Sequence, residues 1–69
     1  MSTIALTSLG KSVAEDTSRR GPEFAVLSML YEANSPVDFE EVMDATGMDD
    51  EKTSMVCRRL ISKGYVKEL

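Results

Sequence analysis

Basic side chains gather near the C-terminus, where five lysines and arginines lie between Lys52 and Lys67 with no acid among them. Side chains of these two types bind phosphate groups, and arginine also donates paired hydrogen bonds to the edge of a guanine. The stretch from Glu32 to Glu51 is the reverse, with eight acids and no base. These two blocks predict a phosphate-binding surface beside an acidic surface. The formal net charge of the chain is −4, which by itself disfavours binding to nucleic acid.

Other kinds of chemistry have few candidate residues. With one cysteine, Cys57, and no histidine, the chain has no internal disulfide, no zinc site of ordinary ligand spacing and no histidine for proton transfer. Its 69 residues allow one small domain over residues 1–69, without a second lobe to close over a substrate. We therefore expect a protein that is not an enzyme and that holds no cofactor or metal. No stretch resembles a membrane span or a secretory leader, so we expect a cytoplasmic, intracellular protein with no membrane partner.

The N-terminal part of the chain predicts a brief strand over Met1–Leu6, followed by an accessory helix. Thr7 is a residue type favoured at an N-cap, and Leu9 and Val13 recur at helical spacing, which predicts a helix from Thr7 to Ser18. Gly10 weakens this prediction, because an interior glycine costs a helix about 1 kcal/mol. Leu9 and Val13 can bury little against so small a core, so we expect this helix to contact a second copy of the chain.

Two further helices are predicted by their start and stop residues. Pro22 suits the first turn of a helix, and the Asn-Ser-Pro stretch that closes with Pro36 ends it. Asp38 opens an N-terminal capping pattern for a helix over 39–46, which Gly47 ends. The residues predicted to face inward from these two helices are Phe24, Val26, Leu27, Met29, Leu30, Tyr31, Phe39, Val42, Met43 and Thr46.

Most of the basic block lies on a fourth predicted helix. Asp49 and Asp50 cap its start and Gly64 follows its end, which predicts a helix over about 50–63. The alternation of apolar and polar side chains over residues 65–69 predicts a terminal strand. The residues predicted to face inward from the fourth helix are Val56, Cys57, Leu60 and Ile61.

The order of these elements resembles a winged helix-turn-helix domain of the MarR-like kind. Residues 37–48, Val-Asp-Phe-Glu-Glu-Val-Met-Asp-Ala-Thr-Gly-Met, are similar to the first helix and turn of that motif. Residues 58–66, Arg-Arg-Leu-Ile-Ser-Lys-Gly-Tyr-Val, are similar to the end of its recognition helix and the entry to its wing. The resemblance implies a mostly α fold with a small β-sheet and four helices. In it, residues 22–69 form the helix-turn-helix core and wing strand, and residues 1–21 form a strand plus the accessory helix.

The predicted wing strand over residues 65–69 needs a partner, and the N-terminus supplies a candidate. Residues 3–11, Thr-Ile-Ala-Leu-Thr-Ser-Leu-Gly-Lys, are similar to the returning strand and helix that follow the wing in this family. We therefore hypothesise that Thr3–Leu6 pairs with Tyr65–Leu69 and completes the sheet, as in a permuted winged helix.

The resemblance implies a small DNA-binding transcriptional regulator that reads double-stranded DNA, as a homodimer, with the helix over about 50–63. The positions that it implies for DNA contact are Lys52, Ser54, Met55, Arg58, Arg59, Lys63 and Lys67. Bases near a helix C-terminus also offset the helix dipole, which needs no ligand. An alternative function is a winged-helix module for protein–protein contacts in a transcription or replication assembly, because an acidic face beside a basic one also suits a protein partner.

Overall fold

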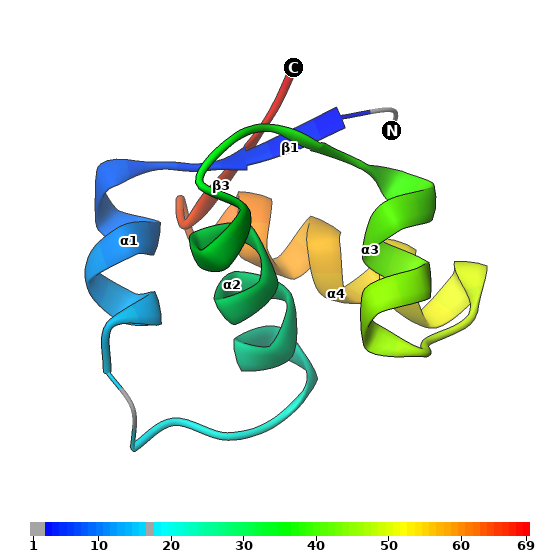
Figure 1. Ribbon diagram of the computed structural model, residues 1–69, viewed down its shortest axis with the longest axis horizontal. Helices are drawn as coiled ribbons and strands as arrows, with labels where there is room; N and C mark the ends of the chain where they lie inside the picture. Colours follow the sequence, from blue (N-terminus) through cyan, green and yellow to red (C-terminus); the bar gives the residue numbers. More distant parts are fainter. Residues whose placement is uncertain (1–2, 17) are drawn as a thin grey trace.

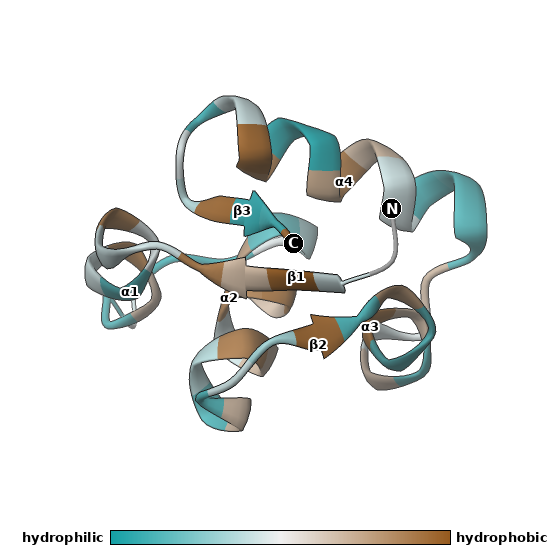
Figure 2. Ribbon diagram, turned by 90° about the horizontal axis from the view of Figure 1, so that it is seen from above, coloured by the Kyte–Doolittle hydropathy of each residue, from teal (hydrophilic) through white to brown (hydrophobic). Residues whose placement is uncertain are grey.

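The computed structural model describes residues 3–16 and 18–69, and within them the sheet has three short antiparallel strands. They are β1 (Thr3–Leu6), β2 (Val37–Asp38) and β3 (Val66–Glu68), in the order β2-β1-β3. Figure 2 shows β1 between its two neighbours, with α4 beside β3 and α3 at the end of β2. The N-terminal strand is therefore the central strand of the sheet.

Four helices lie on one side of this sheet in the described part of the chain. They are α1 (Ser8–Ala14), α2 (Pro22–Ala33), α3 (Phe39–Thr46) and α4 (Asp50–Ser62). In Figure 1, α2 lies beneath the strands, with α1 and α3 to either side and α4 behind. The predicted fold class, mostly α with a small β-sheet, is confirmed, and the predicted extents of α2, α3 and α4 agree closely with the structure.

The predicted pairing of the N-terminal and C-terminal strands is also confirmed. β1 and β3 are antiparallel, in a register that sets Ala5 opposite Lys67. The backbone N–H of Leu69 donates to the carbonyl of Thr3 at 2.9 Å, which extends the ladder beyond β3. Residues 1–2, Met and Ser, which the prediction includes in the strand, lie outside the described residues.

The sequence does not predict β2, because two residues are too few to show an alternating pattern. Val37 pairs with Ile4 of β1, and Asp38 pairs with Thr3. The carboxylate of Asp38 also accepts a hydrogen bond from the backbone N–H of Glu41 at 2.9 Å, which is the predicted N-terminal cap of α3. β2 therefore passes directly into α3 and ties the start of that helix to the central strand.

Helix α1 is shorter than predicted, because it ends at Ala14 and not at Ser18. After it, the carboxylate of Asp16 accepts hydrogen bonds from the backbone N–H and the hydroxyl of Ser18, at 3.1 and 2.6 Å. A local bond of this kind gives the backbone an alternative to another helical turn. Thr17, which the prediction includes in the helix, lies outside the described residues.

The buried face of α1 differs from the predicted one. Gly10, Val13 and Ala14 are buried, whereas Leu9 is 53% exposed. Positions i, i+3 and i+4 share one stripe of a helix, and Leu9 lies beside that stripe. The sequence led us to expect that Val13 contacts a second copy of the chain. The structure shows instead that the chain itself covers Val13.

A close contact joins the start of α1 to the turn that follows α4. Thr7 donates from its backbone N–H to the carbonyl of Tyr65 at 3.1 Å and from its hydroxyl to the carbonyl of Gly64 at 2.6 Å. The same hydroxyl oxygen accepts the backbone N–H of Gly10 at 3.0 Å, as predicted for an N-cap. A Cβ at Gly10 would lie 1.9 Å from the Tyr65 carbonyl oxygen, so only glycine fits this approach.

Buried apolar side chains from every described helix and strand form one core. Burial confirms the inward positions predicted for Val26, Leu27, Leu30, Val42, Val56, Cys57 and Leu60. Tyr31 is an exception, since its side chain is 42% exposed and its hydroxyl donates to the Glu15 carboxylate at 2.8 Å. Thr53 is a core residue that the sequence pattern misses. It is fully buried, and its hydroxyl oxygen has no hydrogen-bond partner within residues 3–16 and 18–69.

Candidate nucleic-acid interface

Helix α4 carries most of the predicted site, and local interactions at its two ends set its length. The carboxylate of Asp49 accepts the backbone N–H of Lys52 at 2.8 Å, which caps the start of the helix. Gly64 follows the end with a φ of 80°, in the left-handed region that glycine adopts without strain. Val56 and Leu60 anchor α4 to the core and leave the opposite face of the helix in solvent.

Five of the seven predicted contact residues lie together on this solvent face. The face is a shallow hollow along the helix, which we call the α4 surface, and it is lined by Asp50, Glu51, Ser54, Met55, Arg58, Arg59, Ser62 and Lys63. Glu51, Met55, Arg58 and Ser62 follow one another at helical spacing, so they form its central stripe. Sequence reasoning leaves out the two acids and Ser62, although the same spacing would have included them.

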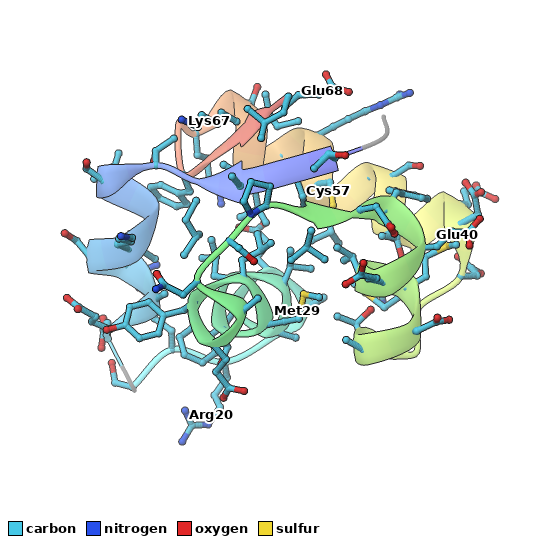
Figure 3. All side chains as sticks on the ribbon, turned by 45° about the horizontal axis from the view of Figure 1, so that its top comes forward. Arg20, Met29, Glu40, Cys57, Lys67 and Glu68 are labelled. Carbon is cyan, nitrogen blue, oxygen red and sulfur yellow. The ribbon has the colours of Figure 1, made fainter. Side chains whose placement is uncertain are left out.

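Lys52 and Lys67 do not line the α4 surface. Lys52 is exposed in the first part of the helix, and Lys67 is on β3. Lys67 lines a separate hollow with Lys11 and Tyr31. Figure 3 shows Lys67 on the sheet side of the molecule and Arg20 on the opposite side. A ligand seated on the α4 surface would not reach Lys67 through the same hollow.

Charge changes sign along the α4 surface. Asp50 and Glu51 lie in the first turn, and Arg58 and Arg59 lie in the second half of the helix, so both pairs offset the helix dipole. Among the described residues, no hydrogen bond or ion pair engages either guanidinium group. The neighbouring helix α3 exposes three more acids, Glu40, Glu41 and Asp44. An anion is therefore repelled from the N-terminal end of α4 and attracted to its C-terminal half.

Lys63 lies at the edge of the α4 surface and already has an acidic partner. Its ammonium group donates to the carboxylate of Glu23 at 2.6 Å, where the two side chains are 49% and 29% exposed. Glu23 is in the first turn of α2, so the pair joins the end of α4 to the start of α2. Lys63 can contact a phosphate only if it leaves or shares this carboxylate.

The α4 surface and its charges are the features on which a functional assignment can rest. Comparison with known protein families, curated proteins and solved structures found no match. Across residues 3–16 and 18–69, no helix is both long and apolar enough to cross a membrane, and no three His, Cys, Asp or Glu side chains converge as metal ligands.

Two further side chains of reactive types, Cys57 and Tyr31, have structural explanations that need no ligand. Cys57 points into the interior from α4, as Figure 3 shows, and is fully buried. Burial raises the pKa of its thiol, which disfavours the reactive thiolate form. The hydrogen bond from Tyr31 to Glu15 raises the pKa of that phenol, because the neighbouring carboxylate favours the protonated hydroxyl. We therefore assign neither residue to the candidate interface.

Proposed function

We propose that the protein is a small DNA-binding transcriptional regulator that contacts double-stranded DNA through the α4 surface. The observation that carries this proposal is that Arg58 and Arg59 have no ion-pair partner within residues 3–16 and 18–69. They lie side by side on the exposed half of a helix that packs against a shorter capped helix. Such a helix pair joined by a tight turn is the usual frame for presenting a recognition helix to the major groove. A protein with this role would work inside the cell, and we place it in the cytoplasm as part of the same proposal.

The strand pairing supports a permuted winged-helix arrangement for this proposal. β3 follows α4 where a wing strand is expected, and β1 lies beside it where a returning strand would lie. α1 then follows β1 directly, with Thr7 as the joint. The N-terminal segment thus takes the place of a second wing strand, and the proposal needs no hairpin after β3.

The contact residues of the α4 surface have separate roles in this proposal. Arg58, on the central stripe, donates to a guanine edge or to a phosphate. Arg59 and Ser54 lie on either side of this stripe and donate to phosphates of the two DNA strands. Asp50 and Glu51 repel phosphate from the start of α4, so the DNA backbone approaches the C-terminal half of the helix.

Replacing Arg58 with alanine is expected to weaken binding to a random-sequence duplex by about fivefold or more at low salt, because one charge-assisted contact is lost. The affinity is measured by titrating the protein into duplex DNA at about 50 and 200 mM salt. Backbone amide shifts recorded during the titration should concentrate on α4 in the wild type and weaken in the variant.

Lys11→Ala is the matched control, since it removes one exposed base from α1 outside the α4 surface. Its affinity should stay close to that of the wild type. An equal loss in the two variants would mean that DNA responds to net charge alone, and absence of any amide shift at low salt would contradict the proposal.

Glu23→Gln is expected to raise the affinity for duplex DNA about threefold at low salt, because Lys63 is released to bind a phosphate. The fall of log affinity with log salt should also become steeper, by about one more released counterion. The exposed ion pair is worth at most about 1 kcal/mol to stability, so the fold should persist. The measurement is the same titration at several salt concentrations. A double variant that also carries Lys63→Gln should lose the gain, and an unchanged affinity in Glu23→Gln would exclude Lys63 from the interface.

The second candidate function is a protein–protein interaction module, and Met55 favours it. This apolar side chain is 47% exposed at the middle of the α4 surface, between the acidic and the basic end. An exposed apolar centre with a charged rim suits a protein partner or a second copy of the chain, which would form a homodimer. If DNA causes no amide shifts, Met55→Lys should abolish partner binding or self-association, measured by sedimentation.

A further inference from the structure

A second basic hollow lies next to the α4 surface. It is formed between the segment that leads into α2 and the flank of α4, and Arg19, Arg20 and Arg59 line it. Arg59 lines the α4 surface as well, so the two hollows are contiguous. The fold thus brings an arginine pair from the loop after α1 to the flank of the helix that carries Arg58.

The charge of this second hollow is positive even after its acidic neighbours are included. Arg19 is paired with Asp16 at 3.3 Å, and both side chains are about half exposed. Glu23, which also lines the hollow, is engaged by Lys63 at 2.6 Å. The charged residues that line the hollow are thus three arginines and one acid, Glu23, which leaves the lining with a net positive formal charge.

The geometry of Arg19 and Arg20 directs basic groups outward. A guanidinium nitrogen of Arg20 donates to the carbonyl of Arg19 at 2.8 Å, which restrains the Arg20 side chain. Figure 3 shows Arg20 extending from the molecule on the side away from the sheet. A restrained, exposed guanidinium loses less conformational entropy when it binds a phosphate than a freely moving one.

We propose that Arg19 and Arg20 bind the phosphate backbone of the same DNA duplex that the α4 surface contacts, with Arg59 linking the two hollows. This inference rests on the proposed function. The described part of the chain spans 26 × 23 × 21 Å, so both surfaces fit within one turn of duplex, about 34 Å long. The acids of α3 and of the first turn of α4 lie at the other end of the interface, so the duplex axis is displaced toward the α1–α2 loop.

The test compares salt dependence among single-charge variants. Arg19→Gln and Arg20→Gln are each titrated with a random-sequence duplex between about 50 and 200 mM salt, beside the wild type and Lys11→Gln. In each arginine variant, the fall of log affinity with log salt is expected to be less steep by about 0.9 than in the wild type. Over that salt range the variant therefore loses roughly threefold less affinity than the wild type does. Lys11→Gln, which removes the same charge from another hollow, should keep the wild-type slope.

Arg20→Lys is the rescue variant, since it keeps the charge and should restore most of the slope. If the wild type binds DNA in a manner that depends on Arg58, but both glutamine variants behave like Lys11→Gln, the second phosphate surface is wrong and the proposed function stands. If the wild type does not bind duplex DNA at low salt, both proposals fail. Equal melting temperatures for the variants verify that only the surface has changed.

Discussion

Replacing Leu60 with alanine is expected to lower the free energy of unfolding by about 2 to 5 kcal/mol, which is most of the stability of a domain this small. The Leu60 side chain is completely buried on the inner face of α4. Its removal leaves a cavity in the core that α4 shares with β1, β3 and α2. The backbone adds a constraint against collapse, because the Leu60 carbonyl accepts the N–H of Tyr65 at 3.0 Å and holds the turn into β3.

The measurement is urea denaturation followed by circular dichroism, with Ile61→Ala as the matched control. Ile61 is the next residue on the same helix and is only partly buried, so its truncation should cost clearly less. Similar losses in the two variants would show that the inner face of α4 is not the one described. A Leu60→Ala protein that is unfolded at room temperature would agree with the expectation, and addition of a stabilising osmolyte would then allow the comparison with Ile61→Ala.

Gly10→Ala is expected to destabilise the protein by about 3 kcal/mol, although helix propensity alone predicts a gain of about 1 kcal/mol. The added Cβ would lie 1.9 Å from the carbonyl oxygen of Tyr65 and 2.8 Å from its carbonyl carbon. These are backbone atoms, so a side-chain rotation cannot relieve the overlap. Either α1 or the turn between α4 and β3 must move, and the hydrogen bonds that Thr7 makes to Gly64 and Tyr65 would be strained or lost.

Ser12→Ala on the same helix is the control for this substitution. Ser12 is exposed, so its replacement should change stability by no more than about 0.5 kcal/mol. Thermal unfolding of the two variants gives the comparison directly, and amide shifts of Tyr65 and Thr7 should move in Gly10→Ala alone. A Gly10→Ala protein as stable as the wild type would mean that α1 does not approach the α4–β3 turn as closely as described.

Because both substitutions act on the same packing of N-terminal and C-terminal segments, they also bear on the candidate interface. Arg58 and Arg59 are presented by a helix whose end is held by Thr7, Gly10 and the β1–β3 ladder. Under conditions where it is folded, a variant such as Gly10→Ala, which loosens the packing around Thr7 and Gly10, should weaken DNA binding less than Arg58→Ala does. Such a result would show that the α4 surface and the packing around Thr7 and Gly10 make separable contributions to DNA binding.

Local sequence is sufficient for α2, α3 and α4. Each has a start residue that suits a helix N-terminus, namely Pro22, Asp38 or Asp49, and each has apolar side chains at helical spacing. These effects act within one or two turns of the chain, so they operate without tertiary contacts. The grouping of Ser54, Met55 and Arg58 on one face follows from the same helical period. The β1–β3 pairing was inferred from the resemblance of residues 3–11 to a strand that follows a wing, and no local pattern required it.

The features that the sequence pattern misses all depend on residues distant in the chain. β2 exists because β1 offers its free edge to Val37 and Asp38, and Gly10 is buried because the Tyr65 carbonyl lies above it. The Lys63–Glu23 pair and the meeting of the arginine pair at 19–20 with Arg59 each join segments about 40 residues apart. Hydrophobic period and capping describe which face of an element is apolar, but packing decides what that face meets. That packing also determines which basic side chains remain available for a phosphate.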